Sequence, residues 1–161
     1  MATIETLIQR GSLIRIDVDL DGPEQVFRRL LALPRFGPLM ETRLPTFVSS
    51  TGAEMTPLEQ VDVLFHDFVV GKPLNHGRQF RRITPGKPPG MHGIWELKTI
   101  DMRIFGWFAA KACFIAVSGD LADNVKDSHL YAGYRNEAVR FRDQLDLDAP
   151  KFVRGGEYDV L

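Results

Sequence analysis

Positively charged side chains gather between residues 78 and 103. Six lysines and arginines lie there against two carboxylates, an excess of four positive charges in a chain of net charge −1, so the remainder carries −5. Such a stretch is typical either of a solvated basic loop or of a patch that faces phosphate, where Phe80 would offer a base a surface to stack on. The cations that would form an RNA-binding patch are Arg78, Arg81, Arg82 and Lys87.

Arg103 differs from the other cations in its surroundings. It lies between Met102 and Ile104, in a run that predicts the central strand of a small sheet. One interpretation is an arginine whose stem packs while its guanidinium reaches solvent. The other is a fixed cation aimed at an anionic ligand such as phosphate. The residue types leave both interpretations open.

The stretch 93–119 predicts the sheet that positions this arginine. It contains runs rich in β-branched and aromatic residues, joined by connections of about three residues, as a meander of antiparallel strands requires. Period-two alternation places Arg103 on one face with Phe105 and Trp107. The runs cover 93–98, 102–108 and 112–118.

Further elements are predicted on both sides of the meander. Thr56 and Glu59 form a capping box with Pro57 at the first helical position, which marks a helix start. Ser128 can cap the last helix. The expected elements are a strand over 13–20, a helix over 23–33 that ends at Pro34, a loop over 35–54 that packs on the core or is mobile, a helix from 57 to about 70 and a helix from 129 to about 145.

These elements predict an α+β fold. A small antiparallel sheet, made of the N-terminal strand and the three-stranded meander, would pack against two N-terminal helices and a C-terminal helix. At 161 residues the chain is expected to form a single domain, 1–161, with its core at about 12–147, a long loop at 35–54 and an extended tail at 148–161.

The composition limits the class of protein. Apolar residues make up 44% and charged residues 25%, as in soluble globular proteins, and the net charge excludes a general nucleic-acid binder. No apolar run approaches the ~20 residues of a membrane span, and the N-terminus lacks the apolar segment of a signal peptide. We therefore expect a cytoplasmic protein without membrane association. The single cysteine, Cys113, lies in an apolar strand and is expected to be an inert thiol.

No metal or cofactor is expected. The sequence Asp17-x-Asp19-x-Asp21-Gly22 resembles the opening of a calcium loop, but the twelfth position is Arg28 instead of the bidentate glutamate. The better interpretation is a solvent-facing strand end followed by a turn. His66 lies in a predicted helix without a neighbouring residue at metal-ligand spacing, so it is interpreted as a packed or surface residue.

Three segments of the meander form recognisable motifs. They are Gly93-Ile94-Trp95-Glu96-Leu97-Lys98, Met102-Arg103-Ile104-Phe105 and Phe114-Ile115-Ala116-Val117-Ser118-Gly119. They resemble the RelE/ParE toxin superfamily, and within it the phage-derived HigB/RelE-like branch. The predicted order of strand, two helices, three-stranded meander and helix is also that of this superfamily. The resemblance covers 13–33 as a pattern and about 56–145 as pattern plus motif.

The resemblance implies the toxin component of a type II toxin–antitoxin system. Such a protein is a metal-independent mRNA interferase, an endoribonuclease that cleaves translated mRNA at the ribosome and is neutralised by a cognate antitoxin. In that family the arginine matching Arg103 contacts mRNA phosphate, and a tyrosine matched by Tyr134 acts in cleavage driven by the 2′-OH. Lys98 would supply further charge, and Tyr134 or His92 would move a proton. The oligomeric state is not implied.

One segment departs from the family's pattern. After the last strand the family carries a basic loop, whereas this chain has Gly119-Asp120-Leu121-Ala122-Asp123. Carboxylates at that place oppose phosphate binding. Two alternatives therefore stand beside the ribonuclease hypothesis: a non-catalytic protein-binding module with the same fold, and a ParE-like gyrase inhibitor.

Overall fold

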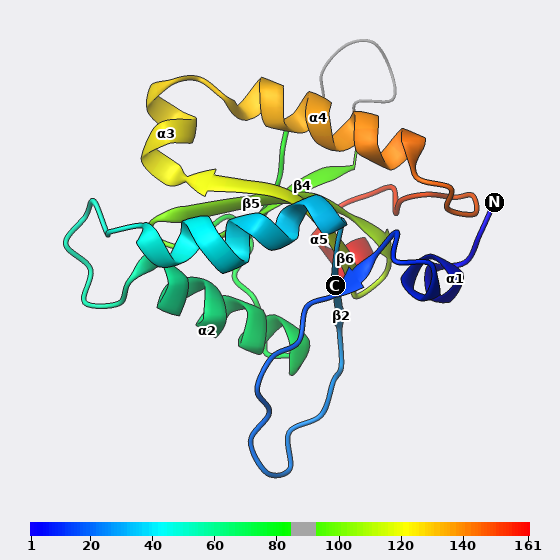
Figure 1. The fold of residues 1–161 in the computed structure, drawn as a ribbon, viewed down its shortest axis with the longest axis horizontal. Helices are drawn as coiled ribbons and strands as arrows, with labels where there is room; N and C mark the ends of the chain where they lie inside the picture. The colour runs from blue at the N-terminus through cyan, green and yellow to red at the C-terminus, as the bar shows by residue number, and fades with distance from the viewer. Residues whose placement is uncertain (85–92) are drawn as a thin grey trace.

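A mixed β-sheet organises the protein. The computed structural model describes residues 1–84 and 93–161, and six strands of this part form one sheet in the order β1-β2-β6-β5-β4-β3. The predicted meander is confirmed as β4 (Ile94–Lys98), β5 (Met102–Ala110) and β6 (Cys113–Leu121), each antiparallel to its neighbour. With helices on both faces of the sheet (Figure 1), the predicted α+β class is confirmed, although the sheet has more strands than expected.

The N-terminal third of the chain differs from the prediction. The strand expected over 13–20 is only β1 (Ile14–Arg15), and the helix expected over 23–33 is wrong, because β2 (Arg29–Ala32) pairs in parallel with β6. Phe27, which an amphipathic helix over 23–33 would place on its apolar stripe with Leu30 and Leu31, is 68% exposed. Ladder hydrogen bonds to a distant strand outweigh a local helical pattern in this segment.

Helices cover the two faces of the sheet differently. α2 (Pro57–Val69) starts at the predicted capping box, where the Thr56 hydroxyl accepts from the Glu59 N–H, and it lies on one face. α3 (Ala122–Asp127) and α4 (Tyr131–Gln144) cover the other face. α4 begins at Tyr131 with no side-chain cap, so Ser128 does not cap it as predicted, and α3 was not expected.

The loop over 35–54 packs on the core, one of the two expectations for it, and the tail over 148–161 also contributes to the core. The predicted loop 35–54 contains short helical turns, η1 (Pro34–Phe36), η2 (Leu39–Arg43) and η3 (Leu44–Thr46), and buries Phe36 and Leu44. The tail, expected to be extended, holds α5 (Glu157–Val160), buries Val160 and accepts a 3.0 Å hydrogen bond at Lys151 O from Trp107 Nε1. A short helix α1 (Ile4–Gln9) adds the buried Leu7.

Alternation along the strands separates two apolar layers. The α2 layer contains Trp95 and Phe108, whereas the α4 layer contains Phe105, Trp107 and Ile115. Side chains of successive strand residues point to opposite faces, so Arg103 lies on the α4 face with Phe105. No helix in the described part of the chain is long and apolar enough to cross a membrane.

Candidate functional site

Polar side chains form two rows across the α4 face of the sheet. Residues opposite each other in neighbouring antiparallel strands share a face. One row contains Arg81, Glu96, Phe105 and Ser118, and the next contains Lys98, Arg103 and Asp120. The strand register therefore brings together two of the predicted catalytic residues, Arg103 and Lys98. The cluster lies at the end of the sheet near the β4–β5 turn.

Arg103 is a buried cation in this cluster. It is only 5% exposed, and one terminal nitrogen donates to the carbonyl oxygens of Thr99 at 2.7 Å and Met102 at 2.9 Å. The interpretation of a guanidinium that reaches solvent is therefore wrong. Carbonyl oxygens fix the guanidinium without neutralising its charge, which suits a cation that must meet an anion.

Glu96 is the carboxylate nearest to this arginine, and it is completely buried. Its Oε1 accepts from Arg81 Nε at 3.0 Å and lies 2.8 Å from Arg81 NH2. Its Oε2 lies 4.0 Å from Arg103 Nε, and neither of these two buried atoms has a hydrogen-bond partner within the described residues. The two atoms form a long ion pair with each other, and each keeps a hydrogen-bonding position that a polar group of a ligand can use.

In the sequence analysis, Glu96 was one of the two carboxylates within residues 78–103, and no role in the site was assigned to it. A usable signal was present, because alternation placed Glu96 on the same face as Ile94, and Ile94 is buried. A carboxylate at an inward-facing position of a central strand is rare unless it is paired or functional.

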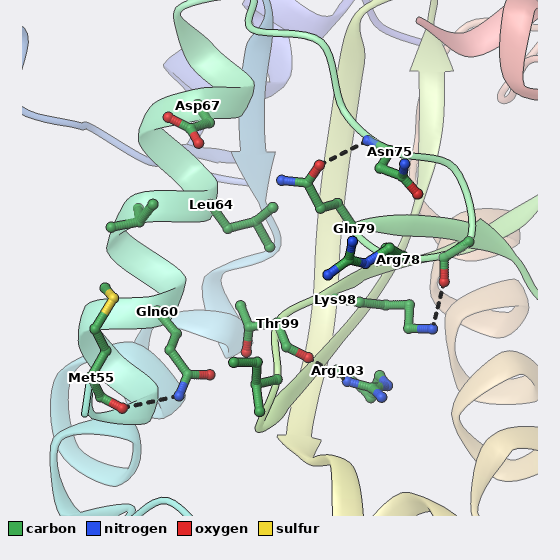
Figure 2. Close-up of a pocket in the computed structure, with 13 residues that line it drawn as sticks. Met55, Gln60, Leu64, Asp67, Asn75, Arg78, Gln79, Lys98, Thr99 and Arg103 are labelled. Atoms are coloured by element: carbon green, nitrogen blue, oxygen red, sulfur yellow. Dashed lines mark hydrogen bonds between the residues drawn. The ribbon is translucent and has the colours of Figure 1, made fainter. Parts of the chain in front are cut away.

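A cavity of about 650 Å³ opens beside the cluster, between α2 and the end of the sheet (Figure 2). Arg78, Lys98 and Arg103 line it. Lys98 Nζ donates to the carbonyl of Gly77 at 2.8 Å, and within 1–84 and 93–161 neither Arg78 nor Lys98 forms an ion pair with a carboxylate. Burial, and next the Arg103 charge, lower the pKa of Lys98, although Glu96 opposes this effect. The cavity lining thus holds three cations and one carboxylate, Asp67, which is already paired with Lys72 at 2.8 Å.

Tyr134 lies on the same face but is already engaged. Its hydroxyl donates to Asp120 Oδ2 at 2.6 Å, and its ring stacks on Phe105 with 4.6 Å between the centroids. Burial, and next this hydrogen bond to Asp120, raise the pKa of Tyr134. A phenol with a raised pKa keeps its proton and is a poor base at neutral pH.

Asp120 begins the acidic segment that departs from the family's pattern. Its Oδ1 accepts from Asn124 Nδ2 at 3.1 Å and from the N–H of Leu121 at 2.8 Å, while Oδ2 accepts from Tyr134. This carboxylate is therefore engaged in holding α3 and α4 on β6. Its repulsion of a phosphate is reduced because three donors surround it.

Tyr131 is a further residue of the cluster, and no pattern in the sequence assigned it to the site. The Arg81 guanidinium lies 5.5 Å from the centre of its ring, and the ring meets Phe105 edge-on at 6.0 Å. Burial, and next the Glu96 charge, raise the pKa of Tyr131. Tyr131 and Arg81 together cover the buried carboxylate of Glu96.

The remaining predicted RNA-binding residues are divided. Arg82 pairs with Trp95 in the register, so it lies on the opposite face from Arg81, and it donates to the carbonyl of Gly155 at 3.0 Å. Phe80 is 3% exposed and stacks on Trp95, so it does not offer a base a surface. Period-two alternation decides both outcomes. Lys87 and His92 lie outside the described residues.

A second polar cluster lies outside this site. Asp21, Glu24 and His66 have ligand-type atoms within 4.8 Å of one another, the single such group found in residues 1–84 and 93–161. His66 Nε2 and Glu24 Oε1 are 2.8 Å apart. Because this histidine and this carboxylate satisfy each other, an ion pair accounts for the cluster.

Comparison with known proteins gives no relative. No protein-family model matches the chain, and no curated protein and no solved structure resembles it at a significant level. The chemistry of the site must therefore be argued from its own geometry.

Proposed function

We propose that this protein is the toxin component of a type II toxin–antitoxin system and cleaves translated mRNA at the ribosome without a metal. The observation that carries the proposal is the pair of buried atoms Glu96 Oε2 and Arg103 Nε, which face each other beside a cationic cavity. A carboxylate next to fixed cations is what attack by a ribose 2′-OH on its own phosphate requires.

The order of elements also supports the proposal. A strand (β2), helical segments ending in α2, the meander β4–β6 and the helix α4 follow one another along the chain. This order agrees in part with the one that the resemblance to the RelE/ParE superfamily implies: β2 takes the place of the strand first expected at 13–20, short helical turns take the place of the first helix, and β3 and α3 are additional. A cognate antitoxin would be the protein partner.

The proposed reaction assigns a role to each side chain of the site. Glu96 takes the proton of the 2′-OH, the O2′–P bond forms, and the P–O5′ bond breaks. The ammonium of Lys98, which releases its proton more readily because its pKa is lowered, protonates the leaving 5′-oxygen. Arg103 stabilises the charge that grows on the phosphoryl oxygens. The products are a 2′,3′-cyclic phosphate and a 5′-hydroxyl.

Access to Glu96 requires Arg81 to change partner. The Arg81 side chain is 45% exposed, whereas Glu96 is buried beneath it. An RNA phosphate competes with Glu96 for the Arg81 guanidinium, because both are anions with the geometry that arginine prefers. Binding of the substrate therefore uncovers the base. Tyr134 holds Asp120 in this arrangement and acts as a positioning residue.

Glu96→Gln tests the assignment, because it keeps the shape of the side chain and removes the base. Wild-type protein is expected to arrest growth on expression and to cleave ribosome-bound mRNA. Glu96→Gln is expected to lower the cleavage rate by about 10²–10⁴-fold. Glu41→Gln, at an exposed position, is the matched control and should cleave at the wild-type rate. Circular dichroism and thermal melts of each variant show whether the fold is kept.

Two results would contradict the proposal. If a folded Glu96→Gln protein cleaves at the wild-type rate, Glu96 is not the base of the mechanism. If the wild-type protein neither arrests growth nor cleaves ribosome-bound mRNA, the ribonuclease function is excluded. The second candidate function, a non-catalytic protein-binding module, would then take its place. That candidate is favoured by the hydrogen bond from Tyr134 to Asp120, because it occupies the hydroxyl that the family's tyrosine would use in cleavage.

A further inference from the structure

The cavity beside Arg103 has an apolar wall that the cleavage chemistry does not use. Met55, Val63 and Ile100 all line it, and they are 40%, 49% and 63% exposed. Large apolar side chains exposed around one hollow are typical of a binding surface. Val63 comes from α2, and Ile100 comes from the β4–β5 turn, so two elements build this wall.

The opposite wall is cationic and polar. Arg78, Lys98 and Arg103 supply the positive charge, while the one lining carboxylate, Asp67 on α2, is paired with Lys72 at 2.8 Å. Gln79 Oε1 accepts from the N–H of Asn75 at 2.8 Å, which leaves its amide nitrogen as a donor that points across the cavity towards α2 (Figure 2). The cavity therefore offers apolar contact on one side, and cations with a neutral donor on the other.

A buried hydrogen-bond pair holds the two elements of the apolar wall together. Gln60 Nε2 donates to Asp101 Oδ2 at 2.6 Å, and the Asp101 N–H donates back to Gln60 Oε1 at 3.0 Å. Both residues are buried, at 7% and 3% exposure. This reciprocal pair joins α2 to the β4–β5 turn next to Ile100, so the cavity is formed before a ligand binds.

We propose that the cavity binds one nucleotide of the RNA, with the phosphate on Arg78, Lys98 and Arg103 and the base against Met55, Val63 and Ile100. The volume of about 650 Å³ lies within the range of about 300–1,000 Å³ for small-molecule sites. A nucleotide is the occupant that the chemistry favours, because it joins an anion and a flat, largely apolar ring in one small ligand. Assignment of that nucleotide to RNA rests on the proposed function.

The test uses free nucleotides and inorganic phosphate with the full chain. The four ribonucleoside monophosphates and phosphate are titrated by calorimetry against wild type, Val63→Ser, Ile100→Ser and Arg78→Ala. The two serine variants are expected to weaken nucleotide binding by roughly tenfold and to leave phosphate binding unchanged. Arg78→Ala is expected to weaken the binding of both. Val48→Ser is the matched control, because Val48 is 79% exposed and does not line the cavity.

The outcomes separate this inference from the proposed function. Nucleotide binding that is unaffected by both serine variants overturns the inference, even when the wild type cleaves mRNA. Nucleotide binding that depends on Val63 and Ile100 supports the inference, even when the wild type cleaves nothing, and the proposed function then fails alone. Binding of an acidic apolar peptide, with none of the four nucleotides bound, also overturns it. Val63 and Ile100 lie on the surface, so both serine variants are expected to keep the fold. Thermal melts of the two variants check this.

Discussion

The hydroxyl of Tyr134 donates to Asp120 Oδ2 over 2.6 Å, and Asp120 is in turn the cross-strand neighbour of Arg103. Tyr134 belongs to α4 and Asp120 to β6, so the hydrogen bond fastens the helix over the face of the sheet that carries the candidate site. The acidic residue that departs from the family's pattern thus has a structural partner. Tyr134 contributes to the site by holding this arrangement.

Removal of the Tyr134 hydroxyl should change the alkaline limit of stability. Its raised pKa means that the folded protein keeps the phenolic proton above the ordinary value of 10.0, at which the unfolded chain releases it. Stability is therefore fully present below that pH and is lost as the pH rises towards the folded pKa. Thermal melts between about pH 9 and pH 11 should show a smaller loss of Tm in Tyr134→Phe than in wild type.

At neutral pH the same variant separates positioning from proton transfer. Tyr134→Phe should lower the free energy of unfolding by about 1 kcal/mol and leave most of the cleavage rate. A loss of cleavage as large as that of Glu96→Gln, at unchanged stability, would show that Tyr134 moves a proton. An alkaline melt identical to that of wild type would contradict the pKa assignment.

Loss of the Gln60 amide should destabilise the protein and open the cavity. Gln60→Leu leaves the 3% exposed carboxylate of Asp101 without its strongest partner, which is expected to lower the free energy of unfolding by about 3 kcal/mol. Because α2 and the β4–β5 turn are then no longer joined, nucleotide binding should weaken in parallel. Urea unfolding and calorimetry measure the two effects. Glu54→Gln, at an exposed position shortly before α2, serves as control.

Substitution by alanine should change the stability of the protein in opposite directions at two glycines. The backbone at Gly106 lies at a register shift between β5 and β6, and a Cβ there would collide with the carbonyl oxygen of Ile115. Gly106→Ala should therefore cost about 3 kcal/mol of stability. Gly133 lies in α4 with open space where the methyl group of an alanine would lie, so Gly133→Ala should stabilise by about 0.5 kcal/mol. Equal melting temperatures of the two variants would contradict this.

The ion pair of His66 and Glu24 should make stability depend on pH in the acidic range. The hydrogen bond to Glu24 is the largest cause that raises the pKa of His66, and the same bond lowers the pKa of Glu24. The histidine's contribution is fully present below its ordinary pKa of 6.5 and is lost as the pH rises through the folded value. The carboxylate's contribution is present above 4.5 and is lost as the pH falls.

The corresponding variant is His66→Gln. Its Tm should change less with pH than that of wild type between about pH 5 and pH 8. His76→Gln removes a histidine that pairs with Glu157 at 3.3 Å on another part of the surface, and is the matched control. A pH profile of His66→Gln that follows wild type would show that the pair does not form in solution.

The hydrogen bonds of Arg103 and the cavity beside it could not be predicted from the sequence. Alternation put Arg103 and Lys98 into the meander, but it does not show that Arg103 turns back onto the carbonyl oxygens of Thr99 and Met102. Both acceptors lie within four residues of Arg103, but alternation records only the face of a side chain and not the groups to which it turns. The cavity likewise needs the contact between Gln60 and Asp101, two residues that lie far apart in the chain.

The sequence by itself determined the elements whose stabilising contacts are local. The meander follows from alternation and short turns, and the start of α2 follows from the hydrogen bonds that Thr56 and Glu59 exchange within one helical turn. Tertiary structure alone decided the rest. Residues 29–32 carry a pattern that also suits a helix, and they form a strand because β6 supplies backbone partners from the far end of the chain. Glu96 stays buried as a charged residue because Arg81 comes from another strand to pair with it, and no pattern local to β4 records that partner.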